Sequence, residues 1–221
     1  MIWDPFDPVS YLVHVGLGFL ALSAGLIALG SQKGSPLHKR AGRWFAYPMV
    51  LVALSTFIFM FHRFLPLAIV MALATLYCIP SALRAARYTE YTGRRWDGLL
   101  LTLPTLLCIF TALQAIRFSQ IDGAPVLGPC VLALTFGCLA AQDILLLKRG
   151  ALPHNGWVRR HLTRMVLAFT FAVMAVVRIG INFGLTLEQT VVGPLLVAVL
   201  IIAYFYRRYP VEDMQVSSAT H

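Results

Sequence analysis

The chain has 221 residues, of which 59% are hydrophobic and only 12% are charged. A soluble domain carries about 25% charged residues, so this composition excludes an ordinary soluble domain. The net charge of +9 would suit a nucleic-acid partner. The basic residues instead stand beside apolar segments long enough to cross a bilayer, so we expect no nucleic acid and predict contacts with membrane lipids.

Seven apolar segments each approach the roughly 20 residues that a helix needs to cross the hydrocarbon core. We expect spans at residues 10–30, 43–62, 65–86, 98–117, 126–147, 161–184 and 190–206. Pro80 and Pro104 should kink the third and fourth spans or mark their ends. Because the joining segments are short, neighbouring helices should run antiparallel. The predicted fold class is all-α, a polytopic membrane helix bundle.

The bundle is expected over residues 10–206, after a short external segment 1–9 and before a polar cytoplasmic tail 207–221. The first segment holds Asp4 and Asp7 and no basic residue, which is not typical of a cleavable signal peptide.

Fifteen of the 18 lysines and arginines fall in four stretches that follow the first, third, fifth and seventh spans. These stretches are Lys33/Lys39/Arg40/Arg43, Arg84/Arg87/Arg94/Arg95, Lys148/Arg149/Arg159/Arg160/Arg164 and Arg207/Arg208. Basic loops stay on the cytoplasmic side of a membrane. The pattern therefore predicts an N-terminus outside and a C-terminus inside.

Four cysteines, Cys78, Cys108, Cys130 and Cys138, lie inside apolar spans, and none forms a C-x-x-C pair. A thiolate metal site is therefore not expected, and we interpret them as small hydrophobic residues.

Four histidines near span ends are the main candidates for chemistry. His14 and His62 are expected near the outer face, whereas His38, just before the second span, and His161, opening the sixth, are expected near the inner face. Ionisable residues in membrane spans are functional candidates, and neutral imidazole is a common ligand of haem iron. All four are therefore candidate metal ligands for a b-type haem.

The first span adds a packing clue. At 100° per residue, Gly18, Ala21 and Gly25 share the face of His14. A smooth groove beside a histidine would suit a flat macrocycle, which makes Gly18 a candidate cofactor-binding residue. Small residues also let membrane helices approach closely without any ligand, and the sequence leaves both interpretations open.

The sixth span places His161, Arg164 and Arg178 within roughly 100° of arc. Arginines suit haem propionates because they form bidentate charged hydrogen bonds. The alternative is that Arg164 extends to the inner face and Arg178 to the outer one. Asp143, in the fifth span, is expected to form a structural ion pair with Arg164 or Lys148.

Spacing limits the haem hypothesis. His38 and His62 lie 24 residues apart, which is about 36 Å along a straight helix and wide for two haems that exchange electrons directly. Two separate sites, or one site with interfacial histidines, are less strained. We expect His14 and His62 to meet near the outer face. We also expect His38, Arg43, His161 and Arg164 to form an inner pocket if the second and sixth helices are neighbours.

Three motifs occur in order: His14-x3-Gly18, His38-x3-Gly42-Arg43-x3-Tyr47, and Arg160-His161-x2-Arg164-Met165. Together they resemble an uncharacterised bacterial family of multi-pass membrane proteins, catalogued as a domain of unknown function, over most of residues 10–184. The chain departs at Thr163-Arg164-Met165, where the family often has Trp-Met. The resemblance implies a bacterial inner-membrane protein. Its histidine pattern is similar in style to diheme b-type cytochromes, which is analogy alone.

Three functions compete. The first is a membrane redox protein that binds b-type haem and exchanges electrons with quinone. The second is a non-enzymatic accessory subunit, with other membrane subunits as partners and its histidines in interhelical hydrogen bonds. The third is a small-molecule transporter, which broken helices and a midplane acidic residue would favour. A zinc hydrolase is disfavoured because no H-E-x-x-H occurs and no carboxylate accompanies His14 or His62 on its span.

Overall fold

The computed structural model describes residues 8–60, 64–87, 94–150, 152, 155–181 and 184–210. Within these ranges there are seven α-helices, one π-helical turn and no strand. They are α1 (Pro8–Gly30), α2 (Pro36–Phe59), α3 (Pro66–Arg87), α4 (Arg94–Ser119), α5 (Leu127–Arg149), α6 (Gly156–Ala175), η1 (Val176–Ile181) and α7 (Leu187–Arg208). Seven described helices are long and apolar enough to cross a membrane, which confirms the predicted all-α membrane bundle.

Two helices begin five or more residues earlier than hydropathy indicated. α2 starts at Pro36 instead of residue 43, because Ser35 caps it by accepting a 3.1 Å hydrogen bond from the His38 N–H, and proline is favoured in a first turn. α6 starts at Gly156 instead of residue 161. The expectation that His38 precedes its helix and that His161 opens its helix was therefore wrong. Both histidines lie within helical turns, which fixes their directions.

Prolines do not end the helices that contain them. Pro80 lies inside α3 and Pro104 inside α4, and Pro48 and Pro194 lie inside α2 and α7. The expectation that Pro80 or Pro104 marks a helix end was therefore wrong. The ends expected from hydropathy, residues 86 and 117, lie close to the observed ends at Arg87 and Ser119.

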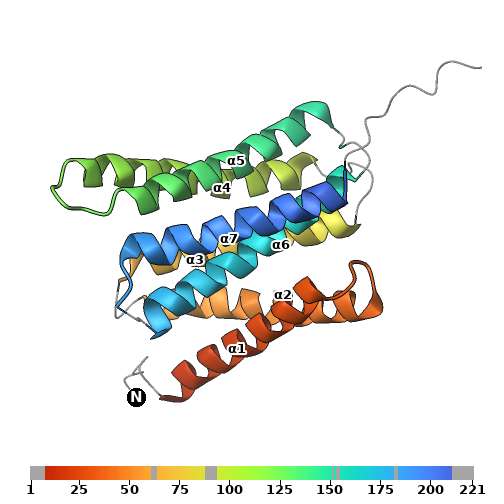
Figure 1. The fold of residues 1–221 in the computed structure, drawn as a ribbon, viewed down its shortest axis with the longest axis horizontal. Coiled ribbons are helices and arrows are strands. Elements are labelled where there is room, and N and C mark those ends of the chain that lie inside the picture. Colours follow the sequence, from red (N-terminus) through yellow and green to blue (C-terminus); the bar gives the residue numbers. More distant parts are fainter. Residues whose placement is uncertain are drawn as a thin grey trace, which may run out of the picture.

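Two helices form the centre of the molecule. Figure 1 shows α1 and α2 as a pair on one side, α4 and α5 as a pair on the other, and α3, α6 and α7 between them. In α3 and in the α6 span, 61% of the most apolar 18-residue stretch is buried inside the bundle, against 17–33% in the other five described spans. Their core side chains include Tyr77, Phe171 and Met174. Outward apolar side chains such as Phe19, Leu106 and Leu200 are exposed, as lipid-facing residues should be.

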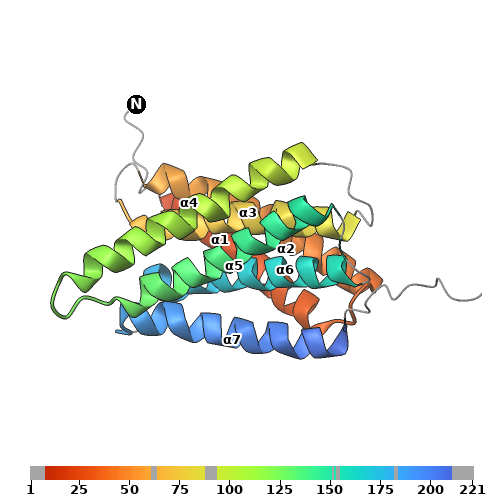
Figure 2. The ribbon, with the colours of Figure 1, turned by 90° about the horizontal axis from the view of Figure 1, so that it is seen from above.

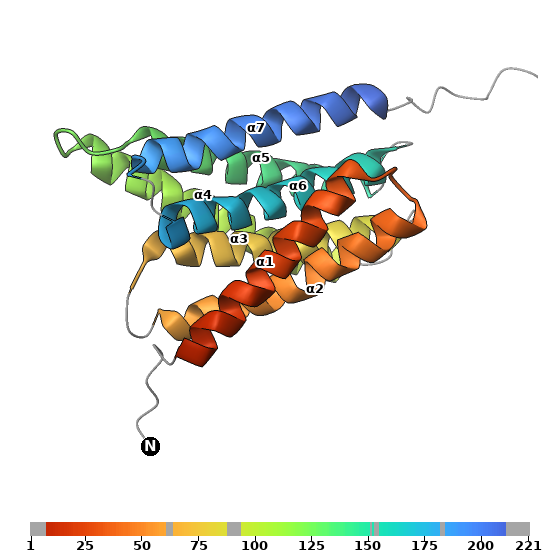
Figure 3. The same ribbon diagram turned by 60° about the horizontal axis from the view of Figure 1, so that its bottom comes forward.

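The helix ends with basic residues gather at one end of the bundle. Figures 2 and 3 show the turn between α1 and α2, the start of α6 and the last turn of α7 at this end, opposite the start of α1. We call it the basic end. Placing it in the cytoplasm stays a prediction from the charge pattern.

Candidate functional site

Four helices surround the candidate site at the basic end. α1 and α3 each pack against both α2 and α6, so the four form a ring in which α2 and α6 occupy opposite corners. His38 lies in the first turn of α2 and His161 in the second turn of α6. The ring therefore brings histidines 123 positions apart in the chain to the same end of the bundle.

The two imidazoles face a common space. Their ring centroids are 6.5 Å apart and their planes meet at 78°. Both rings are only partly exposed. The structure thus brings together His38 and His161 as expected for the inner face, and α2 and α6 also meet through the Phe45 and Phe169 rings, whose centroids are 6.0 Å apart. The intervening helices α1 and α3 position both rings. We call these two residues the histidine pair.

Backbone carbonyls fix which nitrogen of each ring is free. His38 Nδ1 lies 3.0 Å from the carbonyl oxygen of Ala28 in α1, and His161 Nδ1 lies 2.9 Å from that of Ala82 in α3. A carbonyl only accepts, so each Nδ1 carries the hydrogen and each Nε2 of the neutral ring keeps its lone pair. A hydrogen bond from the ring nitrogen that does not bind the metal typically orients a metal-ligating histidine.

The separation of the histidine pair suits a shared metal ion. Their 6.5 Å separation and 78° interplanar angle are those of an ordinary edge-to-face ring pair, and two Nε2 atoms on such rings would suit a metal that histidine bonds at about 2.0–2.1 Å. Gly42 lies one turn beyond His38 on the same face of α2. A Cβ at Gly42 would meet no atom within 4 Å, so no neighbouring side chain packs against α2 at this glycine.

The two arginines expected beside the histidine pair do not join it. Arg43 is exposed. Arg164 is 0% exposed and points to the junction of α3, α5 and α6. The predicted inner pocket of His38, Arg43, His161 and Arg164 therefore does not include this arginine. The alternative, in which Arg164 extends to the inner face, was also wrong. The carboxylate partner of Arg164 in α5, Asp143, offsets part of the cost of taking the charge out of water.

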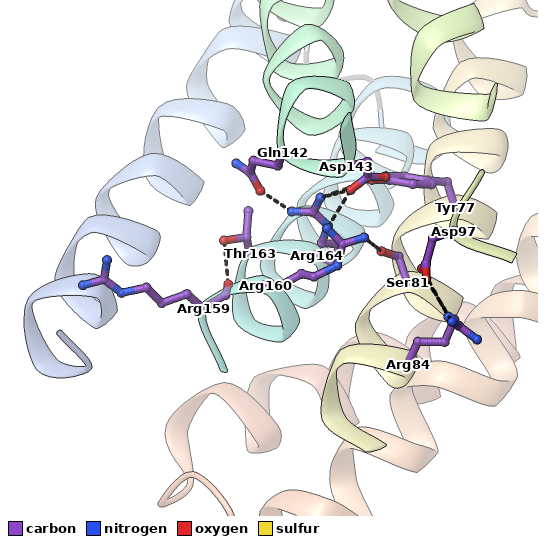
Figure 4. A network of polar contacts seen from close by, with 10 residues as sticks. All are labelled: Tyr77, Ser81, Arg84, Asp97, Gln142, Asp143, Arg159, Arg160, Thr163 and Arg164. Atoms are coloured by element: carbon purple, nitrogen blue, oxygen red, sulfur yellow. Dashed lines mark hydrogen bonds and ion pairs between the residues drawn. The ribbon is translucent and has the colours of Figure 1, made fainter. Parts of the chain in front are cut away.

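Arg164 belongs to a buried polar group that we call the Asp143 cluster, made of Tyr77, Asp143, Arg160 and Arg164 (Figure 4). Asp143 Oδ1 lies 2.6 Å from Arg164 Nη2 and 2.7 Å from Arg160 Nη1. The Tyr77 hydroxyl donates to Asp143 Oδ2 at 2.6 Å. All four side chains are buried, so α3, α5 and α6 are joined by charged hydrogen bonds with little access to solvent.

Two further partners extend the cluster. Arg160 Nη2 lies 3.4 Å from Ser81 Oγ, and Arg164 Nη1 donates to Gln142 Oε1. Arg164 Nε is buried without a hydrogen-bond partner. The predicted ion pair of Asp143 with Arg164 is confirmed, and no ion pair of Asp143 with Lys148 is seen among the described residues. The i, i+4 spacing of Arg160 and Arg164 could have indicated that both share this partner, whereas nothing in the sequence singled out Tyr77.

His14 has a comparable contact toward the opposite end. Its Nδ1 lies 2.7 Å from Ser55 Oγ in α2. The Ser55 hydroxyl already donates to the Val52 carbonyl at 2.9 Å, so His14 Nδ1 is the donor and its Nε2 is free. The Phe59 ring packs edge-on against His14 with centroids 5.2 Å apart. His62 lies outside the described residues, and the expected meeting of His14 with His62 stays a prediction.

The small-residue face of α1 divides into two parts. A Cβ at Gly25 would lie 2.7 Å from the Phe169 ring and 3.0 Å from that of Phe45, so this glycine allows close helix packing. A Cβ at Gly18 would meet nothing within 4 Å. The packing interpretation therefore holds at Gly25, and the cofactor interpretation stays open at Gly18.

Other basic residues at this end stabilise helix termini. Lys33 Nζ donates to the carbonyls of Ala28 and Leu29 at 3.1 and 2.6 Å and lies over the Phe205 ring. Burial lowers the pKa of Lys33, and the nearby Arg208 lowers this pKa further. Arg159 donates to the last carbonyls of α7. Cations suit helix C-termini, so these residues have structural partners already.

No cluster of three or more His, Cys, Asp or Glu side chains able to hold a metal occurs among the described residues, and the four cysteines are free thiols. Comparisons with protein-family models, with curated proteins and with solved structures found no match. The family resemblance therefore stays a prediction, and the histidine pair has to be interpreted from its own geometry.

Proposed function

We propose that this chain is an integral membrane redox protein that holds a b-type haem between His38 and His161 at its basic end. One observation carries the proposal: two partly buried imidazoles, 6.5 Å apart, each have Nδ1 bonded to a backbone carbonyl and Nε2 free. Neutral Nε2 atoms of this kind would suit the iron of a haem, which His38 and His161 would then hold.

The residues around the pair supply the remaining requirements. Ala28 and Ala82 hold the rings in one tautomer and orientation through their carbonyls. No neighbouring side chain packs against α2 at Gly42, one turn beyond His38. When bound, the haem supplies one-electron chemistry; the protein supplies ligands, orientation and an apolar surrounding.

Membrane location agrees with a lipid-soluble electron partner. The spans are apolar and their outward side chains are exposed apolar residues. A quinone within the bilayer is the partner class we propose, in a bacterial inner membrane with the basic end in the cytoplasm. The orientation rests on the charge pattern of the sequence, and the choice of membrane rests on the family resemblance.

The proposal is tested by haem content. The full chain, purified in detergent from cells supplied with a haem precursor, should contain haem by the pyridine haemochrome assay. His38→Ala and His161→Ala should each lower the haem per chain while helix content by circular dichroism is unchanged. His221→Ala, at the end of the sequence, is the matched control and should keep the wild-type amount. Haem-free wild-type protein, or a double variant that retains all its haem, would contradict the proposal.

A second function, a non-enzymatic membrane subunit, is favoured by the Asp143 cluster. Its buried ion pairs join three helices without needing any ligand, and histidine contacts to carbonyls also serve as interhelical hydrogen bonds. In that case the purified protein has no Soret band and the histidine variants lose only stability. The haem assay therefore separates the two functions.

A further inference from the structure

The Asp143 cluster carries an unbalanced charge. Arg160 and Arg164 are two cations, and Asp143 is their one anion. No other carboxylate forms an ion pair with either arginine within the described part of the chain. Tyr77 donates to Asp143 as a neutral phenol. The cluster therefore has a formal charge of +1 in the interior of the bundle.

Burial makes this charge effective at a distance. Arg164 is 0% exposed and Asp143 is 2% exposed, so neither group is screened by bulk water. Charges in a low-dielectric interior act over longer distances than charges at a surface. One arginine would neutralise Asp143, and the second adds a further desolvation cost. A purely structural ion pair does not require this second arginine.

The cluster and the histidine pair are joined at one point in the fold. Arg160 and His161 are consecutive in α6, and their contacts in α3, Ser81 and Ala82, are consecutive as well. Consecutive Cα atoms are about 3.8 Å apart. The Arg160 side chain turns toward α5 while His161 turns toward His38. The Asp143 cluster and the histidine pair are thus held by neighbouring residues of the same two helices, α3 and α6.

We propose that the Asp143 cluster sets the reduction potential of the haem held by the histidine pair, an inference that rests on the proposed function. Reduction adds one electron to the iron and needs no proton or further reactant. The added negative charge is stabilised by a nearby buried positive charge. The net charge of the cluster therefore raises the midpoint potential, and Arg160 and Asp143 act on it with opposite signs.

Charge variants separate this effect from a change of packing. Arg160→Gln makes the cluster neutral and keeps the Arg164–Asp143 pair, so the midpoint potential should fall. Arg160→Lys keeps the charge and should leave the potential near the wild-type value. Asp143→Asn raises the charge to +2 and should raise the potential in whatever fraction of this variant folds. Arg178→Gln removes an arginine about 27 Å further along the same helical segment and is the matched control.

The measurement is a spectroscopic redox titration of purified full chain, with dithionite as the electron donor. A lower potential in Arg160→Gln, absent from Arg160→Lys and Arg178→Gln, supports the inference. If Arg160→Gln binds haem with the wild-type potential, or if Arg160→Lys shifts it equally, the inference fails and the haem proposal stands. Wild-type protein without haem overturns both. Should Asp143→Asn not fold, the Arg160 variants decide alone.

Discussion

At the residue scale, the contacts of a histidine determine which ring nitrogen is available for chemistry. His38 and His161 donate Nδ1–H to carbonyls, and His14 donates it to a serine whose own hydrogen is committed elsewhere. In all three residues no hydrogen bond to Nε2 is found among the parts of the chain that the structure describes. This shared tautomer makes the histidines plausible ligands and gives the Ser55 hydroxyl a defined role beside His14.

Asp143 should be the most sensitive polar position in the bundle. Asp143→Ala leaves two buried arginines without a counter-ion and should cost about 3–5 kcal/mol of stability. The check is the thermal unfolding midpoint in detergent. Asp97→Ala, which removes the 3.1 Å pair with the more exposed Arg84, is the control and should cost only about 1 kcal/mol. Equal losses of stability in the two variants would show that the buried cluster contributes no more than the more exposed ion pair.

The sequence predicted residue types better than residue partners. His38, His161 and the Asp143–Arg164 pair could be selected because polar groups in apolar spans stand out. Tyr77 could not, since a tyrosine in an apolar span is ordinary until its neighbour is known. Arg43 and Arg164 were grouped with the histidines because they share an end of the bundle, but direction around a helix decides contact.

At the element scale, Gly25 is the glycine at which α1 packs tightly against side chains of α2 and α6. Gly25→Ala places a Cβ 2.7 Å from the Phe169 ring and 3.0 Å from the Phe45 ring. Both rings must shift, which should cost about 1–3 kcal/mol. Gly16→Ala, in the same helix with no atom within 4 Å, should be neutral or stabilising because alanine favours helix. Comparing the two unfolding midpoints tests this, and a Gly25→Ala variant as stable as Gly16→Ala would contradict it.

Helix existence was predictable and helix starts were not. Apolar length marks only the part of a helix inside the hydrocarbon. α2 and α6 continue into polar turns at the basic end, where Ser35 and Pro36 begin α2. His38 lies in the extra turns of α2, and His161 directly follows the extra turn of α6. A cap-and-proline signal could have extended α2 from sequence, which would have placed His38 on a helix at once.

At the scale of the whole molecule, charge asymmetry predicts the orientation of the bundle. Asp122 lies between α4 and α5, and Gly150 follows α5 at the basic end. Reporter fusions at these two positions should report opposite sides of the membrane, with Gly150 in the cytoplasm. Two fusions on the same side would contradict both the helix count and the orientation.

Overall architecture follows from the sequence because only helices satisfy their own backbone polar groups in lipid. The ring of α1, α2, α3 and α6 does not follow, because the apolar spans offer no local signal for which faces meet. That ring is what places His38 opposite His161. The candidate site is therefore a property of the packed bundle, although its residues are visible in the chain.

The central claim is that His38 and His161 together ligate one haem. The electron paramagnetic resonance spectrum of the oxidised, purified protein tests this most directly, because two imidazole ligands give low-spin ferric iron. We predict a low-spin signal that is replaced by a high-spin signal in His161→Ala, where one axial ligand is lost. No ferric haem signal, or an unchanged low-spin signal in the His38→Ala/His161→Ala double variant, would contradict the account.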